Sequence, residues 1–325
     1  MKSFAYYRRL IRLFYHYKKK STRLPYFPVR LWIELTSHCN YRCVMCPNKD
    51  LKKSESGTMD MHLFQKVLDE SEDLVFDINL AHRGESLLHP RLSEAIQYAK
   101  KKNFYTRLHT NGSLLTEELS RKIVQSGLDR LSFSFDGYDK DTYEQIRRGG
   151  NFEKTMSNIV RFLEIKKESG SKTPMTSIEV INFENRDPEK PTEAKKAFEA
   201  RFRGLPLNAM ATKELHNWAG ETESKKSSDC YSVCPFPWNA LVILWDGKVL
   251  PCTQDFFGYY VLGDAKTTSL QEIWNGEGIS RLRKKLAEAR IDDIETCAQC
   301  DRPRRRGFLG VPREYLWKFV TKRMP

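Results

Sequence analysis

The sequence predicts an α/β fold, in which a large domain of repeated βαβ units precedes a small C-terminal domain. Short apolar runs alternate with helical stretches up to about residue 212, and this alternation is typical of parallel sheets. From Cys230 onward the pattern changes to a hairpin and two helices. A chain of 325 residues is long enough for one large domain and one smaller one.

The large domain is predicted to contain six strands, each followed by a helix or a loop that carries chemistry. Apolar and β-branched runs predict strands at 30–35, 74–80, 105–109, 131–135, 175–182 and 207–212. Helical spacing of apolar residues predicts helices at 61–72, 90–102, 116–125, 151–165 and 193–201. In the C-terminal part, Asp246-Gly247 separates two short apolar runs and predicts a β-hairpin, followed by helices at 269–274 and 279–289.

Seven of the eight cysteines form two groups. Cys39, Cys43 and Cys46 have the spacing C-x3-C-x2-C, and the second group is Cys234, Cys252, Cys297 and Cys300. Three thiolates on one loop can hold three irons of a [4Fe–4S] cube and leave the fourth iron open, whereas four thiolates close a second cube. The C-x3-C spacing differs from the C-x2-C pairs of zinc ribbons, and two structural zinc sites are the alternative. The eighth cysteine, Cys230, is a bystander, an alternate ligand or a thiol that returns a hydrogen atom to substrate.

Composition limits the location and the partners. Clustered cysteines that bind iron must stay reduced, so we expect a cytoplasmic, anaerobic setting. No apolar run approaches the length of a membrane span, and Arg8, Arg9 and Arg12 interrupt the segment that a signal peptide would need. The net charge of +13 lies at the ends: residues 1–30 hold nine Lys or Arg and no acid, and residues 301–325 hold eight Lys or Arg and two acids. The central part is therefore slightly acidic, which argues against a nucleic-acid groove.

The N-terminal cysteine motif resembles that of the radical S-adenosylmethionine (SAM) superfamily. The resemblance implies an open, partial (β/α)6 TIM-like barrel and two cofactors, a [4Fe–4S] cluster and SAM. In that family the open iron chelates SAM, and an electron from a donor such as flavodoxin or ferredoxin cleaves it to methionine and a 5′-deoxyadenosyl radical. That radical abstracts hydrogen from the substrate, while the protein orients the reactants and excludes water.

Further motifs follow the predicted strands. Arg83-Gly84-Glu85-Ser86 resembles the family's Gly-Gly-Glu motif, with arginine in the place of the first glycine. The resemblance implies that Gly84, Glu85, Ser134 and Arg147 seat SAM, with Ser134 on the ribose and Arg147 on the carboxylate. Thr110-Asn111-Gly112 is also found in related enzymes and is expected to shape the SAM pocket.

The second cysteine group, with the Asp246-Gly247 turn, resembles the shortened SPASM, or "twitch", auxiliary-cluster domain. We therefore predict a basic leader at 1–28, the barrel at 29–220, an auxiliary [4Fe–4S] domain at 221–301 and a basic aromatic tail at 302–325. Lys213 or His216 is a candidate substrate contact, although a packing turn around Trp218 is equally compatible. In such enzymes the auxiliary cluster accepts the electron of the substrate radical.

Three functions remain open from the sequence. The first is oxidation of an alcohol of the sugar or cyclitol type, on a small or lipid-linked substrate, which the lack of a recognisable peptide-binding wing favours. The second is a peptide or protein maturase, and the third is a non-catalytic, metal-bound adaptor at a membrane. Residues 7–17 predict a basic amphipathic helix, and 315–320 are similarly aromatic. These tails predict either docking on the fold or peripheral contact with the inner face of the membrane.

Overall fold

The computed structural model describes residues 4–183, 193–222, 231–304, 307–308 and 311–312. Cys230 and the aromatic segment 315–320 lie outside these residues. The chain forms two compact units. The barrel unit contains Trp32–Leu215 and Leu244–Gly247, and the auxiliary unit contains Met1–Leu31, His216–Ile243 and Lys248–Pro325.

The barrel unit is an open, mostly parallel sheet, as the sequence predicts. Its strand order is β6-β5-β4-β3-β2-β1, and the neighbours from β2 to β6 pair in parallel. The strands are β1 (Arg30–Ile33), β2 (Asp77–Asn79), β3 (Tyr105–Thr110), β4 (Arg130–Ser134), β5 (Met175–Asn182) and β6 (Ala209–Glu214). The chain passes from one unit to the other within β1.

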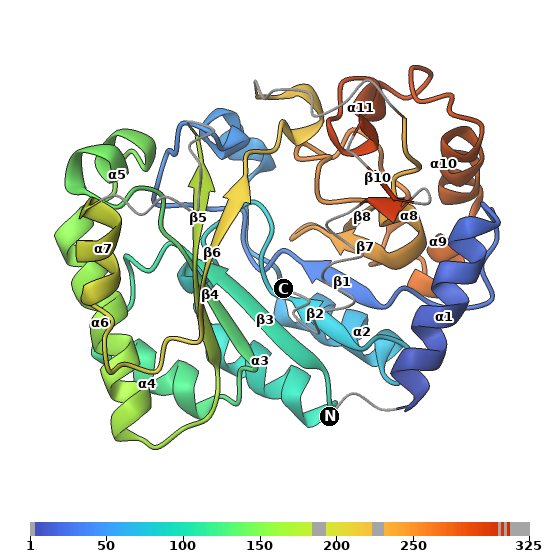
Figure 1. Ribbon diagram of the computed structural model, residues 1–325. Coiled ribbons are helices and arrows are strands. Elements are labelled where there is room, and N and C mark those ends of the chain that lie inside the picture. Colours follow the sequence, from blue (N-terminus) through green and yellow to red (C-terminus); the bar gives the residue numbers. More distant parts are fainter. Residues whose placement is uncertain (1–3, 184–192, 223–230, 305–306, 309–310, 313–325) are drawn as a thin grey trace. The chain divides into compact units, whose positions relative to one another are not determined.

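Helices join these strands and cover one side of the sheet (Figure 1). They are α2 (Met61–Ser71), α3 (Leu92–Lys101), α4 (Glu117–Gln125), α5 (Lys140–Ile146), α6 (Phe152–Glu168) and α7 (Glu193–Ala200). Single turns of 3-10 helix are η1 (Pro47–Asp50), η2 (Lys53–Glu55) and η3 (Ser86–Leu88). The predicted helices are confirmed to within a few residues, but α5 was not predicted.

Local chemistry explains where these helices begin. The side chains of Asp60, Thr116, Asp139 and Asn151 each accept a backbone N–H in the first turn of the helix that follows. Apolar faces then pack on the sheet. At the centre, Phe135 stacks on Tyr143 with ring centroids 4.3 Å apart and contacts Phe152 edge to face. This packing fixes α5 and α6 against the end of β4.

The auxiliary unit contains three antiparallel strands and several short helices. Strands β7 (Ala240–Ile243), β8 (Lys248–Leu250) and β9 (Gly263–Asp264) pair in that order. The helices are α1 (Phe4–Lys18), α8 (Phe236–Asn239), α9 (Leu270–Trp274), α10 (Glu277–Ala287) and α11 (Glu295–Ala298). Single turns of 3-10 helix are η4 (Trp218–Gly220) and η5 (Arg302–Arg304). Two further short strands, β10 (Gly307–Phe308) and β11 (Val311–Pro312), pair with each other. No helix in the described ranges is both long enough and apolar enough to cross a bilayer.

The N-terminal segment is built into this unit. The indole N–H groups of Trp238 and Trp274 donate to the carbonyls of Ser21 and Tyr26. Buried Arg283 donates to the carbonyls of Thr22 and Pro237 and lies over the Trp274 ring. Three buried side chains of the auxiliary unit therefore hold residues 21–26 by hydrogen bonds to their backbone carbonyls.

Candidate functional site

The first group of cysteines lies on the loop that follows β1. Cys43 is buried, and Cys39 and Cys46 are half-buried. The loop is held by backbone hydrogen bonds, from Arg42 N–H to the Arg148 carbonyl at 2.8 Å and from Val44 N–H to the Ile146 carbonyl at 2.9 Å. Helix α5, which ends at Ile146, therefore fixes the position of the cysteine loop.

The three thiols influence one another. Burial raises the pKa of Cys39 to about 11 and that of Cys46 to about 12, and the neighbouring thiolates contribute to both shifts. Among the described residues, no three His, Cys, Asp or Glu side chains close around a single metal ion. A four-iron cube binds each thiolate on a separate iron, so its ligands stand farther apart than the ligands of one zinc ion. Three thiols on one loop can fill three corners of such a cube and leave the fourth iron open.

The motif after β2 approaches this loop closely. A Cβ atom on Gly84 would lie 2.3 Å from the Thr36 carbonyl oxygen and 2.5 Å from that of His38. Only glycine fits against backbone at such distances. The next residue, Glu85, donates its backbone N–H to the same His38 carbonyl at 2.9 Å. Gly84 therefore allows the motif to pack on the loop that holds the cysteines.

The carboxylate of Glu85 is buried and accepts three hydrogen bonds. Its Oε1 accepts from Leu87 N–H at 3.0 Å and from the Thr110 hydroxyl at 2.8 Å, and its Oε2 accepts from Asn111 N–H at 2.7 Å. Burial raises the pKa of Glu85, while these hydrogen bonds oppose the shift. Because Oε2 accepts one bond only among these, it retains acceptor capacity for a ligand ammonium.

Thr110 and Asn111 of the Thr-Asn-Gly motif thus position Glu85, a role that the sequence did not reveal. Asn111 also links two loops, because its side-chain amide donates to Asn40 Oδ1 at 2.9 Å and its Oδ1 accepts from the Ser113 hydroxyl at 2.7 Å. Asn40 lies in the cysteine loop, directly after Cys39. The cysteine, Gly-Glu and Thr-Asn-Gly motifs are therefore one hydrogen-bonded assembly.

Arg83 explains the departure from the family motif. Its Nε donates to Glu34 Oε2 at 2.6 Å and its Nη2 donates to Oε1 at 2.8 Å, and both side chains are buried. Glu34 also accepts the backbone N–H of Trp245 at 3.4 Å. The arginine is thus one half of a bidentate ion pair that ties the motif to the residue following β1.

Arg147 is buried beside the cysteine loop. Its Nη2 donates to Asp136 Oδ2 at 2.7 Å, its Nη1 lies 4.0 Å from Cys43 Sγ, and its Nε is buried without a hydrogen-bond partner. Burial would lower the pKa of Arg147, but Asp136 and Cys43 more than offset this and keep it charged. Asp136 also accepts Ile181 N–H at 2.6 Å. The unsatisfied Nε–H of Arg147 fits an anionic group at the site. Contact between Arg147 and the SAM carboxylate remains a prediction.

Ser134 ends β4 and is half-buried. In the sheet it lies opposite Glu179 of β5. This places Ser134 at the same edge of the sheet as Thr110, which ends β3, and Asn111, which follows it. Contact between Ser134 and a ribose remains a prediction.

A polar cluster in the barrel unit lies next to these strand ends. Buried Glu179 of β5 faces His109 of β3, with the imidazole Nδ1 3.4 Å from Oε2, and it accepts a hydrogen bond from Lys213 of β6. The side chains of His109 and Lys213 are 27% and 38% exposed, so both are accessible. Trp32 stacks on the His109 ring with an angle of 18° between the planes. The sequence indicated Lys213 alone, because the other two look like ordinary strand residues.

The electrostatics of this cluster follow from burial and pairing. Burial would raise the pKa of Glu179, but its hydrogen bond with His109 and its ion pair with Lys213 lower it, so the group is a carboxylate. Burial lowers the pKa of His109, and Glu179 offsets only part of that shift. His109 is therefore a neutral imidazole that can donate from Nδ1 to Glu179 and accept a proton at Nε2.

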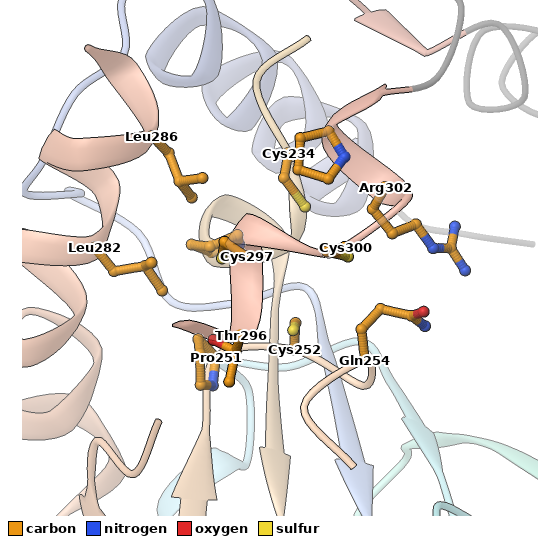
Figure 2. Close-up of a pocket in the computed structure, with 12 residues that line it drawn as sticks. Cys234, Pro251, Cys252, Gln254, Leu282, Leu286, Thr296, Cys297, Cys300 and Arg302 are labelled. Carbon is orange, nitrogen blue, oxygen red and sulfur yellow. The ribbon is translucent and has the colours of Figure 1, made fainter. Parts of the chain in front are cut away.

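The second group of cysteines lines one pocket in the auxiliary unit. In Figure 2 the side chains of Cys234, Cys252, Cys297 and Cys300 border one space. Leucines of α10 and prolines supply most of the remaining lining, and Arg302 and Gln254 lie near Cys300 and Cys252. Burial raises the pKa of Cys252 and of Cys300 to about 12. Four thiols, two of them buried and two half-buried, around an otherwise largely apolar space fit a fully ligated cluster.

The turn before this site supports its last two cysteines. Asn217 donates to the Gln299 carbonyl at 2.6 Å and accepts Asp301 N–H at 3.1 Å. The imidazole Nε2 of His216 is 2.9 Å from Arg302 Nη2. Trp218 is half-buried and packs edge to face on Phe256. These contacts favour the packing interpretation of residues 216–220 over a role for His216 in substrate binding.

Comparison with known proteins finds one family model over each of the two cysteine-containing regions. A family model described as the radical SAM superfamily matches residues 33–187, and an iron–sulfur cluster-binding (SPASM) model matches residues 234–301. The chain is 27% identical over 292 residues to the tungsten-containing aldehyde ferredoxin oxidoreductase cofactor-modifying protein of Pyrococcus furiosus, covering 76% of this chain and 81% of that protein.

Two further similarities extend over most of the chain. It is 23% identical to the S-adenosyl-L-methionine-dependent 2-deoxy-scyllo-inosamine dehydrogenase of Niallia circulans, covering 83% of this chain and 91% of the relative. The crystal structure of BtrN with AdoMet and 2-DOIA has the same fold, with a TM-score of 0.57, 19% identity and coverage of 84% and 93%. The chain therefore belongs to the radical SAM superfamily and carries a C-terminal iron–sulfur cluster-binding SPASM domain.

Proposed function

We propose that this protein oxidises an alcohol carbon of a polar small molecule of the sugar or cyclitol type to a carbonyl. The observation that carries the proposal is the cluster of His109, Glu179 and Lys213, which presents a neutral imidazole and a cation at the strand ends. The name of the Niallia circulans relative, a dehydrogenase, supports the same reaction class.

The cofactors would be held by the residues described above. Cys39, Cys43 and Cys46 would hold the catalytic cluster, Gly84, Glu85, Ser134 and Arg147 would seat SAM, and Cys234, Cys252, Cys297 and Cys300 would hold a second cluster. When bound, these groups supply a radical that accepts a hydrogen atom from carbon and an acceptor for one electron. The chain's own residues must supply substrate orientation and the acceptor for the remaining proton.

His109 is suited to that proton transfer. Oxidation of an alcohol to a carbonyl removes a hydrogen atom from carbon, a proton from oxygen and one electron. Nδ1 of His109 lies 3.4 Å from Glu179 Oε2, and with the proton on this nitrogen the Nε2 lone pair is available to take the hydroxyl proton. Glu179 fixes the tautomer and stabilises the imidazolium that forms, and Lys213 holds Glu179 ionised. Lys213 is exposed enough to donate a hydrogen bond to a second oxygen of the substrate.

The proposal is tested by following the carbinol hydrogen. The anaerobically reconstituted protein would be supplied with SAM, a reductant and a panel of polyols and aminocyclitols deuterated at the carbinol carbon. We expect deuterium to appear in 5′-deoxyadenosine together with formation of a ketone. If deuterium transfer occurred with labelled peptides and with none of the alcohols, the protein would be a peptide maturase.

The role of His109 has its own test. His109→Gln should lower ketone formation about 10²–10⁴-fold, while hydrogen abstraction and 5′-deoxyadenosine formation continue. His62→Gln is the matched control, because His62 is an exposed histidine of α2. Loss of 5′-deoxyadenosine formation and ketone formation in equal measure would show that His109 supports folding or SAM binding instead.

The pH dependence follows from the pKa of His109. Burial lowers it from the ordinary value of 6.5, and the neutral form is the one that accepts a proton. Ketone formation should therefore be independent of this group above a pH of about 6.5 and fall only at more acidic pH. The His109→Gln protein should lose this acidic limb.

A further inference from the structure

The N-terminal helix α1 (Phe4–Lys18) exposes an apolar strip. Tyr7, Ile11, Phe14 and Tyr15 are 48%, 68%, 49% and 50% exposed, and they make up half of the large exposed hydrophobic side chains among the described residues. Their spacing of four, three and one residues places them on one face of the helix. We call these four residues the outward strip.

The opposite face of the same helix is already occupied. Tyr6 and Tyr17 are buried at 3% and 5% exposure. The Tyr17 hydroxyl donates to the Val233 carbonyl at 2.5 Å, and its ring packs edge to face on Trp238. The two expectations for the leader, docking and surface binding, therefore concern different faces of one helix. Docking through the inner face fixes the outward strip in an exposed position.

Basic side chains border the strip. Arg8 and Arg12 are exposed on its flank, and Lys18, Lys19 and Lys20 are exposed at its C-terminal end. Residues 1–30 contain no acidic residue that would neutralise them. Arg9 lies among these cations. Burial lowers its pKa, and the positive charges of Arg12 and Arg8 lower it further.

An anionic lipid surface matches this pattern better than an acidic protein does. Phenylalanine and isoleucine enter the acyl region, tyrosine is favoured at the level of the headgroups, and flanking Arg and Lys pair with anionic headgroups. A helix of 15 residues is too short and too charged to span, so it would lie in the plane of the surface. We propose that the outward strip of α1 and its basic flank bind the surface of an anionic bilayer.

The test is sedimentation of the full-length reconstituted protein with vesicles. Vesicles of phosphatidylcholine and phosphatidylglycerol should bind the protein strongly at low salt, and vesicles of phosphatidylcholine alone should bind it weakly. Part of the binding should persist at high salt, because insertion of the strip does not depend on charge.

Two double variants separate the contributions of the strip and of its flank. Ile11→Ser with Phe14→Ser should weaken binding at least tenfold and remove the part that resists salt. Arg8→Gln with Arg12→Gln should weaken binding to a similar degree at low salt and leave high-salt binding unchanged. The matched control is Met175→Ser with Val261→Ser, which removes two exposed hydrophobic side chains elsewhere and should bind as the wild type does.

The outcomes decide between occupants of the surface. Every variant changes exposed side chains, so iron content and circular dichroism should match those of the wild type and show that folding is intact. If the wild type ignores anionic vesicles at low salt, or if the strip variant binds as well as the control, the surface does not bind membranes. An acidic protein partner would then be the occupant to seek.

Discussion

The two cysteine sites are assembled in different ways. Cys39, Cys43 and Cys46 lie on one loop, and hydrogen bonds from two neighbouring motifs hold that loop and Glu85 together. Cys234, Cys252 and the pair Cys297 and Cys300 come from three separate segments around one pocket. The first site has Arg147 and Glu85 close to it, whereas Arg302 is the charged residue among those that line the second.

This difference in surroundings indicates different tasks. A site with three thiolates, an unsatisfied arginine donor and a buried carboxylate is suited to binding a charged cofactor and reacting with it. A site with four thiolates and a mostly apolar lining is suited to holding a cluster that exchanges electrons.

The largest effect is expected from removal of the first site. In the variant Cys39→Ala, Cys43→Ala, Cys46→Ala, SAM cleavage should be abolished and about four irons should remain per chain, out of about eight in the wild type. Iron analysis and 5′-deoxyadenosine formation measure the two results. Retention of SAM cleavage by this variant would show that the catalytic cluster lies elsewhere.

Removal of one ligand of the second site should separate the two functions. Cys234→Ala should lose or damage the auxiliary cluster and ketone formation while it continues to cleave SAM. Cys230→Ala is the matched control, because its cysteine is four residues away and is not among the predicted ligands. If the Cys230 variant lost the cluster and the Cys234 variant kept it, the assignment of ligands would be reversed.

A smaller effect is expected from breaking the buried ion pair between Arg83 and Glu34. Arg83→Met should destabilise the barrel unit by about 3–5 kcal/mol, because it leaves the buried Glu34 carboxylate without its bidentate partner. Chemical unfolding of the wild type and the variant measures the difference. The double variant Glu34→Leu, Arg83→Met should recover most of the loss, and equal instability of the single and double variants would exclude an unpaired charge as the cause.

The smallest effect is expected from removal of the hydrogen bond between Thr110 and Glu85. Thr110→Val should cost about 1.5–3 kcal/mol, because the Glu85 carboxylate loses one of its three donors. It should also weaken SAM binding, since Glu85 is less firmly placed. Thr110→Ser keeps the hydroxyl and should behave as the wild type in both unfolding and SAM titration. Equal losses in the Ser and Val variants would show that the methyl group matters instead.

The elements of the fold and the two groups of cysteines could be recognised in the sequence because their signals are local. Strand and helix periodicity, Asp-Gly turns and C-x3-C-x2-C spacing need no knowledge of distant residues. Helix α5 was missed because its seven residues are too few and too polar for a clear period, although Asp139, which caps it, was a usable signal.

The partners of the site residues were not predictable, because they are set by the packing of distant segments. Arg83 meets Glu34 across 49 residues, and the position of Glu34 at a strand end did not suggest a buried ion pair. His109, Glu179 and Lys213 meet because β3, β5 and β6 are neighbours or near neighbours in a parallel sheet with a particular register. Strand register follows from the whole packed core and not from any one strand.

The measurement that tests the account most directly is the iron, sulfide and zinc content of anaerobically purified and reconstituted wild-type protein. Two four-iron clusters predict about eight irons and a matching amount of acid-labile sulfide per chain. Stoichiometric zinc with no sulfide would contradict both cluster sites and, with them, the proposed oxidation.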